Sequence, residues 1–273
     1  MKIAYCSDLH LDFYFSNAKA LSERKFRSVF DKYFEDLDSE HLIVAGDVGH
    51  HPMQNLEILK MFQSIYSIKN IITVQGNHEG YRVSNSQRAM FPSGLHKIAY
   101  QMDLFEANGI TALDGTSVEI DGITIGGANS FYDGSIYFKQ TAGWYSSSGG
   151  IDSYWKRTMN DHANMKLDDF MMYSKQEKDK LLKLKDTCDI IVTHVKPVIE
   201  DRFIHPDFKG ELSNCFYTFD WGDNVFSDTK LKYWVYGHTH SVEEYNFADK
   251  TLLCNPYGYP KENLDSKIRH LEI

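Results

Sequence analysis

The sequence has few cysteines, and none of them lie close together. Its 273 residues include four, Cys6, Cys188, Cys215 and Cys254, and no two have the C-x-x-C spacing. The wide separation of the cysteines excludes a cysteine-rich zinc site and gives no disulfide framework. Three of the four follow or sit within apolar runs, so we expect buried thiols in a reducing compartment.

Long apolar runs are absent as well. No stretch approaches the roughly 20 apolar residues that a membrane-spanning helix needs. The N-terminus has neither an apolar signal segment nor a small-residue cleavage site. We therefore expect a cytoplasmic protein without a membrane anchor.

The chain has fewer basic than acidic residues. It contains 29 lysines and arginines and 38 aspartates and glutamates, which gives a net charge of -9. Proteins that hold duplex nucleic acid through its phosphates usually have a basic face. The composition therefore argues against a duplex-DNA-binding protein, although bound divalent cations would make a local site positive. Hydrophobic residues at 42% and charged residues at 25% are typical of a folded globular chain.

The first half of the chain alternates short apolar runs with helical patterns. This β-α-β-α-β order is typical of a parallel sheet covered by helices. The predicted strands are residues 2–7, 42–45 and 71–74, and the predicted helices are residues 18–37, 53–65 and 95–108.

The remainder is richer in strands. Asp114-Gly115 and Asp121-Gly122 separate three β-rich runs, and Asp-Gly in that position indicates hairpins. The predicted elements are strands at 110–113, 116–120, 123–127, 189–193, 233–236, 242–247 and 251–254, and a helix at 174–185. The order predicts an α/β fold of two stacked mixed β-sheets flanked by helices, joined as one domain over residues 1–273.

Two long segments, the first insertion (residues 129–173) and the second insertion (residues 196–228), do not fit this alternation. Segments this long are more often functional than idle, so we expect them to act as lids. Their aromatic residues either stack on a substrate or form a small core of the segments' own. These are Phe131, Tyr132, Trp144, Tyr145, Trp155, Phe203, Phe216, Tyr217 and Trp221. Four cations there or near the motifs are candidates to bind a second phosphate: Arg82, Arg157, Lys196 and Arg202.

Five strand-like runs end in side chains that bind metals. In open α/β sheets, ligands bind beyond the carboxyl ends of the strands, so these side chains should converge. They are Asp8 and His10, Asp47, Asn77 with His78 and Glu79, His194, and His238 with His240. Glycines precede three of these groups, at Gly46, Gly76 and Gly237, where they let the backbone turn tightly and approach the site.

The types of these side chains indicate the chemistry. Carboxylate, imidazole and carboxamide ligands without thiolate suit Mn, Fe, Zn or Ni. Seven of these side chains are candidate ligands, namely Asp8, His10, Asp47, Asn77, His194, His238 and His240. Seven are too many for one tetrahedral ion and suit two ions about 3.5–4 Å apart, with one carboxylate between them. In the pairs Asp8-x-His10 and His238-x-His240, residues i and i+2 leave a strand on the same side, so both can reach one centre.

These motifs, D-x-H, G-D, G-N-H-E, H and G-H-x-H in that order, resemble those of the calcineurin-like metallophosphoesterase superfamily. The resemblance spans Asp8 to His240. It implies an α/β-β/α sandwich and two metal ions, manganese by expectation, with iron, zinc, nickel or magnesium as alternatives. One ion would be held by Asp8, His10, Asp47 and His240, and the other by Asp47, Asn77, His194 and His238.

The resemblance also implies roles in catalysis. Asp47 would bridge the ions together with a hydroxide that attacks phosphorus. His78 would contact the phosphate or protonate the leaving oxygen, and Glu79 would fix the loop or the His78 ring. His50 and His51 stand where the protein serine/threonine phosphatase branch has Asp and Arg, which argues against a protein phosphatase and leaves both as candidate substrate contacts.

Three functions are consistent with these motifs and this composition. The first is two-metal hydrolysis of a phosphomonoester or phosphodiester of a small or nucleotide-like substrate. The second is a nuclease of the same chemistry acting on single-stranded or structured nucleic acid. The third is a non-catalytic binding scaffold, which the intact set of ligands disfavours. The natural substrate, the preference for monoester or diester, the native metals and the oligomeric state stay open.

Overall fold

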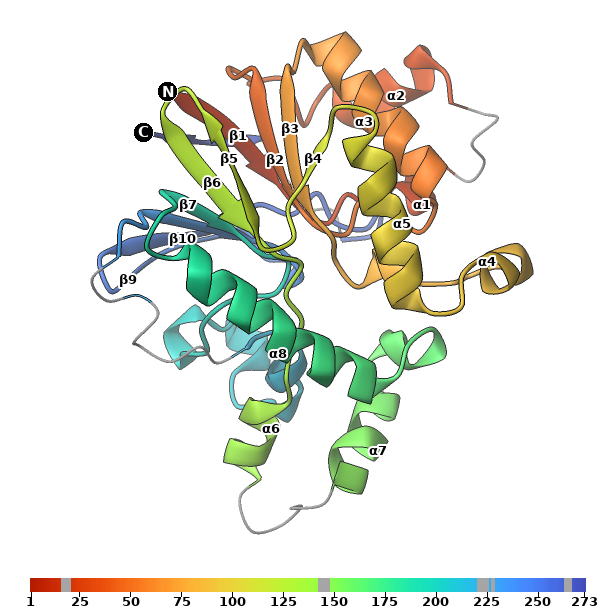
Figure 1. The fold of residues 1–273 in the computed structure, drawn as a ribbon, viewed down its shortest axis with the longest axis vertical. Coiled ribbons are helices and arrows are strands. Elements are labelled where there is room, and N and C mark those ends of the chain that lie inside the picture. Colours follow the sequence, from red (N-terminus) through yellow and green to blue (C-terminus); the bar gives the residue numbers. More distant parts are fainter. Residues whose placement is uncertain (16–20, 142–147, 220–225, 227–228, 263–266) are drawn as a thin grey trace.

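The computed structural model describes residues 1–15, 21–141, 148–219, 226, 229–262 and 267–273. Within them, the strands form two sheets that face each other (Figure 1). The first sheet has the order β11-β1-β2-β3-β4, which are Arg269–Glu272, Lys2–Cys6, His41–Ala45, Asn70–Val74 and Thr111–Ala112. Strands β1 to β4 are parallel, and β11 runs antiparallel to β1.

The second sheet has the order β5-β6-β7-β8-β10-β9. These strands are Thr116–Ile120, Ile123–Gly127, Ile190–Val192, Tyr233–Tyr236, Lys250–Cys254 and Glu243–Phe247. Its inner strands are parallel, while β5 and β9 pair antiparallel at the two edges. Both sheets are therefore mixed, as the sequence predicts.

Alternate side chains along the strands give the first sheet two apolar faces. In β2, Ile43 and Ala45 pack between the two sheets, whereas Leu42 and Val44 face the helices. Successive side chains of a strand point to opposite faces, so a strand covered on both sides reads as a continuous apolar run. Burial of these residues from both sheets holds the sandwich together.

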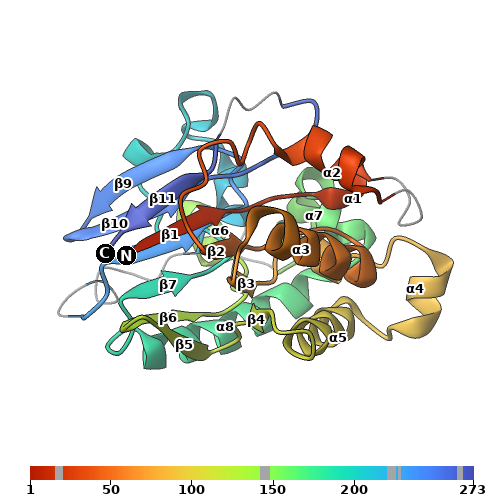
Figure 2. The same cartoon turned by 90° about the horizontal axis from the view of Figure 1, so that it is seen from above.

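Helices cover the outer faces of the sandwich. Residues of α2, α3 and α5 pack on the first sheet, and the C-terminal part of α8 packs on the second. Figure 1 shows α3 next to the first sheet and α8 next to the second, and in Figure 2 α3 lies in front of the strands of the first sheet. These helices are Glu23–Phe30, Pro52–Tyr66, Gly94–Glu106 and Leu167–Leu184. The shorter helices α1, η2 and α4 are Leu11–Tyr14, His78–Gly80 and Asn85–Met90.

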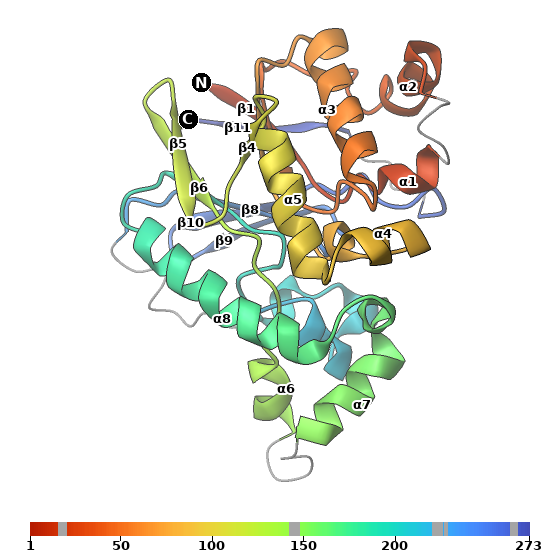
Figure 3. The same cartoon turned by 45° about the vertical axis from the view of Figure 1, so that its right-hand side comes forward.

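The two insertions contain short helices rather than unstructured loops. The first insertion has α6, α7 and η3, and α8 begins within it; the second has η4, η5 and η6. Their bounds are Ser135–Gln140, Ser148–Thr158, Asn160–Ala163, Asp201–Phe203, Pro206–Phe208 and Leu212–Phe216. Figure 3 shows α6 and α7 beyond α8, away from the sheets. Apolar residues of both insertions share one core, which includes Tyr132, Trp155 and Phe216.

Several predicted elements need correction. The helix predicted over 18–37 is only Glu23–Phe30, because Ser22 caps its N-terminus and turns follow from residue 31; residues 16–20 lie outside the described part. The helix predicted from 174 begins at Leu167. Strand β11 was not predicted.

The two Asp-Gly turns have different roles. Asp121-Gly122 closes the β5–β6 hairpin. Asp114-Gly115 instead lies where the chain passes from β4 in the first sheet to β5 in the second, so the hairpin predicted there is wrong.

Candidate metal centre

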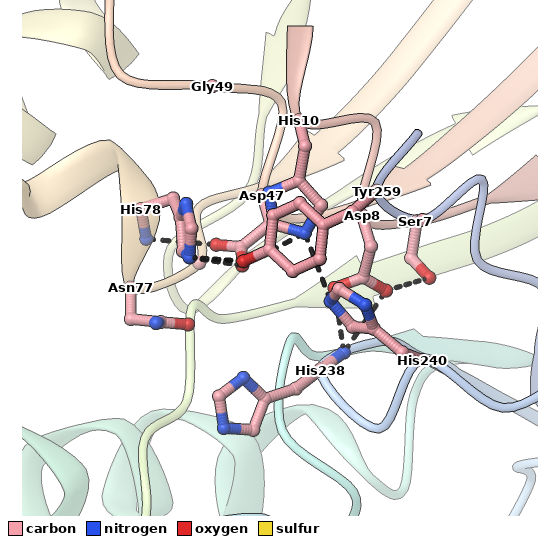
Figure 4. A network of polar contacts seen from close by, with 12 residues as sticks. Ser7, Asp8, His10, Asp47, Gly49, Asn77, His78, His238, His240 and Tyr259 are labelled. Carbon is pink, nitrogen blue, oxygen red and sulfur yellow. Dashed lines mark hydrogen bonds and ion pairs between the residues drawn. The ribbon is translucent and has the colours of Figure 1, made fainter. Parts of the chain in front are cut away.

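The predicted metal-binding side chains meet at the carboxyl ends of five strands. Asp8 and His10 follow β1, Asp47 follows β2, and Asn77 follows β3, all in the first sheet. His194 follows β7, and the pair His238 and His240 follows β8, in the second sheet. All are buried except His240, which is partly buried. Figure 4 shows most of them around one centre.

Their ligand atoms form two neighbouring sets. In one, His240 Nε2 lies 3.0 Å from His10 Nε2 and 3.5 Å from Asp8 Oδ1. In the other, His194 Nε2 lies 3.0 Å from Asn77 Oδ1 and 3.4 Å from Asp47 Oδ1. Asp47 lies between them, since its second oxygen is 4.0 Å from His10 Nε2.

Three groups of side chains have ligand atoms within 4.8 Å of one another and could hold a metal ion. They are Asp8, His10 and His240; His10, Asp47 and His78; and Asp47, His194 and His238. Asp47 and His10 each belong to two groups, so the groups overlap at these two side chains.

Left-handed backbone brings the paired motifs together. Asp8, His10, His238 and His240 have φ values of 53°, 45°, 68° and 50°, and Asp47 has 54°. The two side chains of each pair do converge, as predicted. They do so because the backbone turns in left-handed conformations after the strand, and not because residues i and i+2 share a face of an extended strand, so that part of the prediction is wrong. Such backbone costs about 1–3 kcal/mol per residue and is typical of functional sites.

Glycine is required where the strand ends approach the ligands. A Cβ on Gly76 would lie 2.2 Å from Asp47 Oδ1, and one on Gly46 would lie 2.5 Å from His194 Nδ1. Neither position has room for a side chain. Glycine there therefore allows the backbone to pack directly against the ligands.

The outer nitrogens of three histidines have oxygen partners. His194 Nδ1 lies 2.9 Å from the Ala45 carbonyl, His238 Nε2 lies 3.0 Å from the Phe216 carbonyl, and His240 Nδ1 lies 2.9 Å from Glu262. A carbonyl or carboxylate can only accept, so in the neutral rings these nitrogens carry the proton and the inner nitrogens present lone pairs to the site.

Glu79 ties the loops after β2 and β3 together. Its carboxylate accepts hydrogen bonds from the backbone N–H groups of Asp47, Val48, Gly49 and Gly76. Burial raises the pKa of Glu79 to about 7, and the nearby Asp47 adds to the rise. The contact holds the Asp47 backbone in place.

His78 is the end of a chain of polar contacts. Asp12 Oδ2 lies 2.9 Å from His50 Nδ1, and His50 Nε2 lies 2.8 Å from His78 Nδ1. Since Asp12 accepts the Nδ1 proton of His50, His50 Nε2 accepts from His78 Nδ1. His78 Nε2 then faces Asp47 Oδ2 at 3.8 Å, with the Tyr259 hydroxyl at 3.2 Å.

The segment after β10 adds side chains that the sequence motifs do not include. The ring of Tyr259 stacks on His10 with centroids 4.1 Å apart, and Figure 4 shows it between His78 and His240. Glu262 contacts His240 as described. Neither residue was predicted, and both reach the site only through the path of the folded chain.

The charges of the site fit a bound cation. Burial would lower the pKa of His194, but the Asp47 carboxylate outweighs it and raises the pKa to about 10, so the pocket around Asp47 favours positive charge. His10 Nδ1 is buried and finds no hydrogen-bond partner among the described residues. Together with the convergent lone pairs and the absence of thiolates, these features suit nitrogen- and oxygen-preferring metals.

A cavity of about 560 Å³ opens from this centre, which is within the usual size of a small-molecule site. Asp47, Asn77, His78 and His238 line it, together with residues of both insertions and of the segments around His240 and Tyr259. The insertions therefore form part of its wall.

The insertion aromatics divide into two kinds. Phe131, Tyr132, Trp155 and Phe216 are buried in the core that the insertions share, so they form a small core of their own. Phe203 and Tyr217 line the cavity. Trp144, Tyr145 and Trp221 lie outside the described residues.

The four candidate cations are not equivalent. Lys196 lines the cavity, but its ammonium is bound by Glu243 at 2.7 Å. Arg82 donates to the carbonyls of Phe91 and Pro92. Arg202 pairs with Glu200, and Arg157 is exposed on α7.

A two-sheet sandwich with a cluster of Asp, His and Asn side chains at its strand ends defines a class of metal-dependent phosphoesterases. Residues 1–242 match the model of the calcineurin-like phosphoesterase family. The chain belongs to this family, which confirms the resemblance seen in its motifs.

Two similar proteins extend over nearly the whole chain. An uncharacterized protein of Acanthamoeba polyphaga mimivirus is 25% identical over 284 residues, covering 95% of this chain and 92% of its own. The crystal structure of a phosphopantetheinyl hydrolase from Mycobacterium tuberculosis has a similar fold, with a TM-score of 0.70 and 16% identity. It covers 99% of this chain and 95% of its own. In the described part of the chain, no helix is long and apolar enough to cross a membrane.

Proposed function

We propose that this protein hydrolyses a phosphomonoester or phosphodiester of a small or nucleotide-like substrate at a centre of two metal ions. The supporting observation is the set of overlapping ligand groups at one end of the cavity. Asp8, His10, Asp47 and His240 would hold one ion, and Asp47, Asn77, His194 and His238 the other, with Asp47 shared. We expect manganese, with other first-row ions and magnesium as alternatives.

The bound cations would supply a nucleophilic water and neutralise charge on the phosphate oxygens. The protein itself contributes orientation and proton handling. Burial lowers the pKa of His78 to about 4, so the free ring is neutral at pH 7. An anionic phosphate beside the ring raises that pKa, and His78 Nε2 can then hold a proton for the leaving oxygen.

The nuclease alternative is less well supported by the cavity. Among the described residues, Lys196 is the one lysine or arginine that lines it, and Glu243 already binds its ammonium. A groove that tracks a nucleic-acid backbone needs several free cations. A substrate with one phosphate and an uncharged organic part fits these walls better.

The test compares nitrophenyl phosphate with bis-nitrophenyl phosphate, with added manganese, before and after chelation. Turnover that chelation removes and manganese restores supports the proposal, and the faster ester gives the substrate class. A phosphopantetheinyl ester is a third substrate to include, because the mycobacterial protein of similar fold carries that name. Metal binding without turnover of any ester would contradict the proposal in favour of a binding scaffold.

A further inference from the structure

Asp161, in the first insertion, is a fully buried carboxylate that no sequence motif marks. It lies in η3 and contacts Asn77, one of the proposed ligands. Asn77 Nδ2 donates to Asp161 Oδ1 at 2.8 Å and to the Tyr81 hydroxyl at 3.0 Å. Asp161 and Tyr81 thus both accept on the NH₂ side of the carboxamide, while its oxygen faces His194.

This arrangement permits only one orientation of the Asn77 side chain. If the carboxamide were rotated by 180°, its oxygen would face the Asp161 carboxylate, and two acceptors would be opposed without a proton between them. As it stands, Asn77 Oδ1 points to His194 Nε2 at 3.0 Å. Asp161 therefore aims an oxygen, and not an NH₂ group, at the centre.

Asp161 is itself fixed by the first insertion. Tyr81 donates to its Oδ1, and Tyr132 donates to its Oδ2 at 3.0 Å. Trp155 in α7 in turn donates to the Tyr132 hydroxyl at 2.6 Å. Among the described residues Asp161 forms no ion pair, and a buried carboxylate without one is costly unless something else compensates its charge.

The second insertion acts on the same half of the centre, since the Phe216 carbonyl accepts from His238 Nε2 at 3.0 Å. Phe216 and Tyr132 belong to the core that both insertions share, with ring centroids 5.3 Å apart. The partners of His10 and His240 lie elsewhere, in the segment after β10.

We propose that Asp161 is a positioning residue that orients the Asn77 carboxamide for metal binding. The insertions would then not only cover the metal centre but also complete one of its two sites. This inference rests on the proposed two-metal centre. Residues that orient a metal ligand typically change metal affinity by 10–100-fold when they are removed.

The test is Asp161→Asn, which keeps the side-chain size but can present an NH₂ group to Asn77. After chelation, the protein is titrated with manganese, and binding is followed by calorimetry and by the electron paramagnetic resonance signal of coupled or isolated Mn²⁺. We expect one site to keep its affinity and the other to weaken by roughly 10–100-fold. Asp168→Asn, an exposed aspartate of the same insertion, is the matched control and should bind like the wild type.

Adding Asn77→Ala separates positioning from a structural role. If Asp161 acts through Asn77, Asp161→Asn weakens the site no further once Asn77 is alanine, and equal losses in both backgrounds would overturn the inference. Unchanged binding of two ions by Asp161→Asn would overturn it too. Should Asp161→Asn fail to fold, Tyr81→Phe removes the other acceptor of Asn77 and must weaken the same site. A wild type that does not bind two ions would refute the proposed centre itself.

Discussion

Both ring nitrogens of His78 have polar partners, which restricts how the ring can turn. Asp12 and His50 hold one side, and Tyr259 lies on the other. The ring also stacks on Tyr81, with centroids 4.5 Å apart. This support suits a side chain that must meet a phosphate in one orientation.

We predict that His78→Ala retains both metal ions but lowers kcat by about 10²–10⁴-fold, the usual contribution of a general acid or base. The reason is that His78 is not one of the proposed ligands, although it lies close enough to Asp47 to be a candidate. Steady-state kinetics with the preferred nitrophenyl ester and elemental analysis of the same sample measure the two effects.

His96→Ala is the control for this variant, because His96 is exposed on α5 and contacts Ser93. Its rate and metal content should match the wild type. Loss of a metal ion from His78→Ala would make His78 a ligand, and a near-normal rate would remove it from the mechanism.

At the residue scale, the sequence predicted the side chains that converge but not the ones that orient them. The motif residues follow strands, and the edge at which parallel strands end is known before the structure. Asp161, Tyr259 and Glu262 reach the site through loops and insertions whose paths depend on packing. Their contacts link residues 84, 181 and 22 positions apart, and no local pattern encodes them.

At the element scale, α8 contributes Glu177 and Lys180 to a charge cluster in which Glu177 is buried. Lys180 donates to Glu177 at 2.7 Å and to Asp114 at 2.6 Å. Burial, and then the nearby Asp114, raises the pKa of Glu177 to about 7. A carboxyl whose pKa is higher in the folded state binds a proton more tightly there, so stability is lost as pH rises.

We therefore predict that ionisation of Glu177 lowers the free energy of unfolding between about pH 4.5 and pH 7, with full stability below that range. A rise of this size corresponds to about 3 kcal/mol at most. Glu177→Gln cannot ionise and should lose less stability over the range, as measured by urea unfolding at pH 5 and pH 7.5.

Glu57→Gln, an exposed change on α3, is the control and should follow the wild type at both pH values. If the Glu177→Gln variant and the wild type change in parallel, the buried carboxyl has no special role in the pH dependence.

The start of α8 also shows where local sequence misleads. Ser174 looks like the N-cap of a helix, but it is buried inside α8, and its hydroxyl donates to the Phe131 carbonyl. Strand β11 was missed because its pairing partner, β1, lies at the other end of the chain. Strands bounded by turns and buried on both faces were predicted well, since their apolar runs are continuous.

At the scale of the whole molecule, the candidate centre lies where the two sheets meet. Three of the strands that lead to it belong to the first sheet and two to the second. The sequence predicted two sheets, but which strands share a sheet depends on crossings such as Asp114-Gly115, and a turn motif does not reveal them. Ions bound at the centre would join ligands from both sheets.

Metal removal should therefore destabilise the whole fold and not only stop catalysis. Each ion that binds only the folded state, at 100 times its Kd, adds about 2.7 kcal/mol to the free energy of unfolding. For a chain of this size, that corresponds to a fall in Tm of roughly 5–10 °C on chelation. Scanning calorimetry of the protein with manganese, with chelator and after manganese is restored measures this change in Tm.

Asp47→Asn, which removes the charge shared by both proposed sites, should unfold at nearly the same temperature in all three conditions. A wild-type Tm that stays constant while elemental analysis shows the metal gone would mean that the sheets hold the ligands in place without the ions.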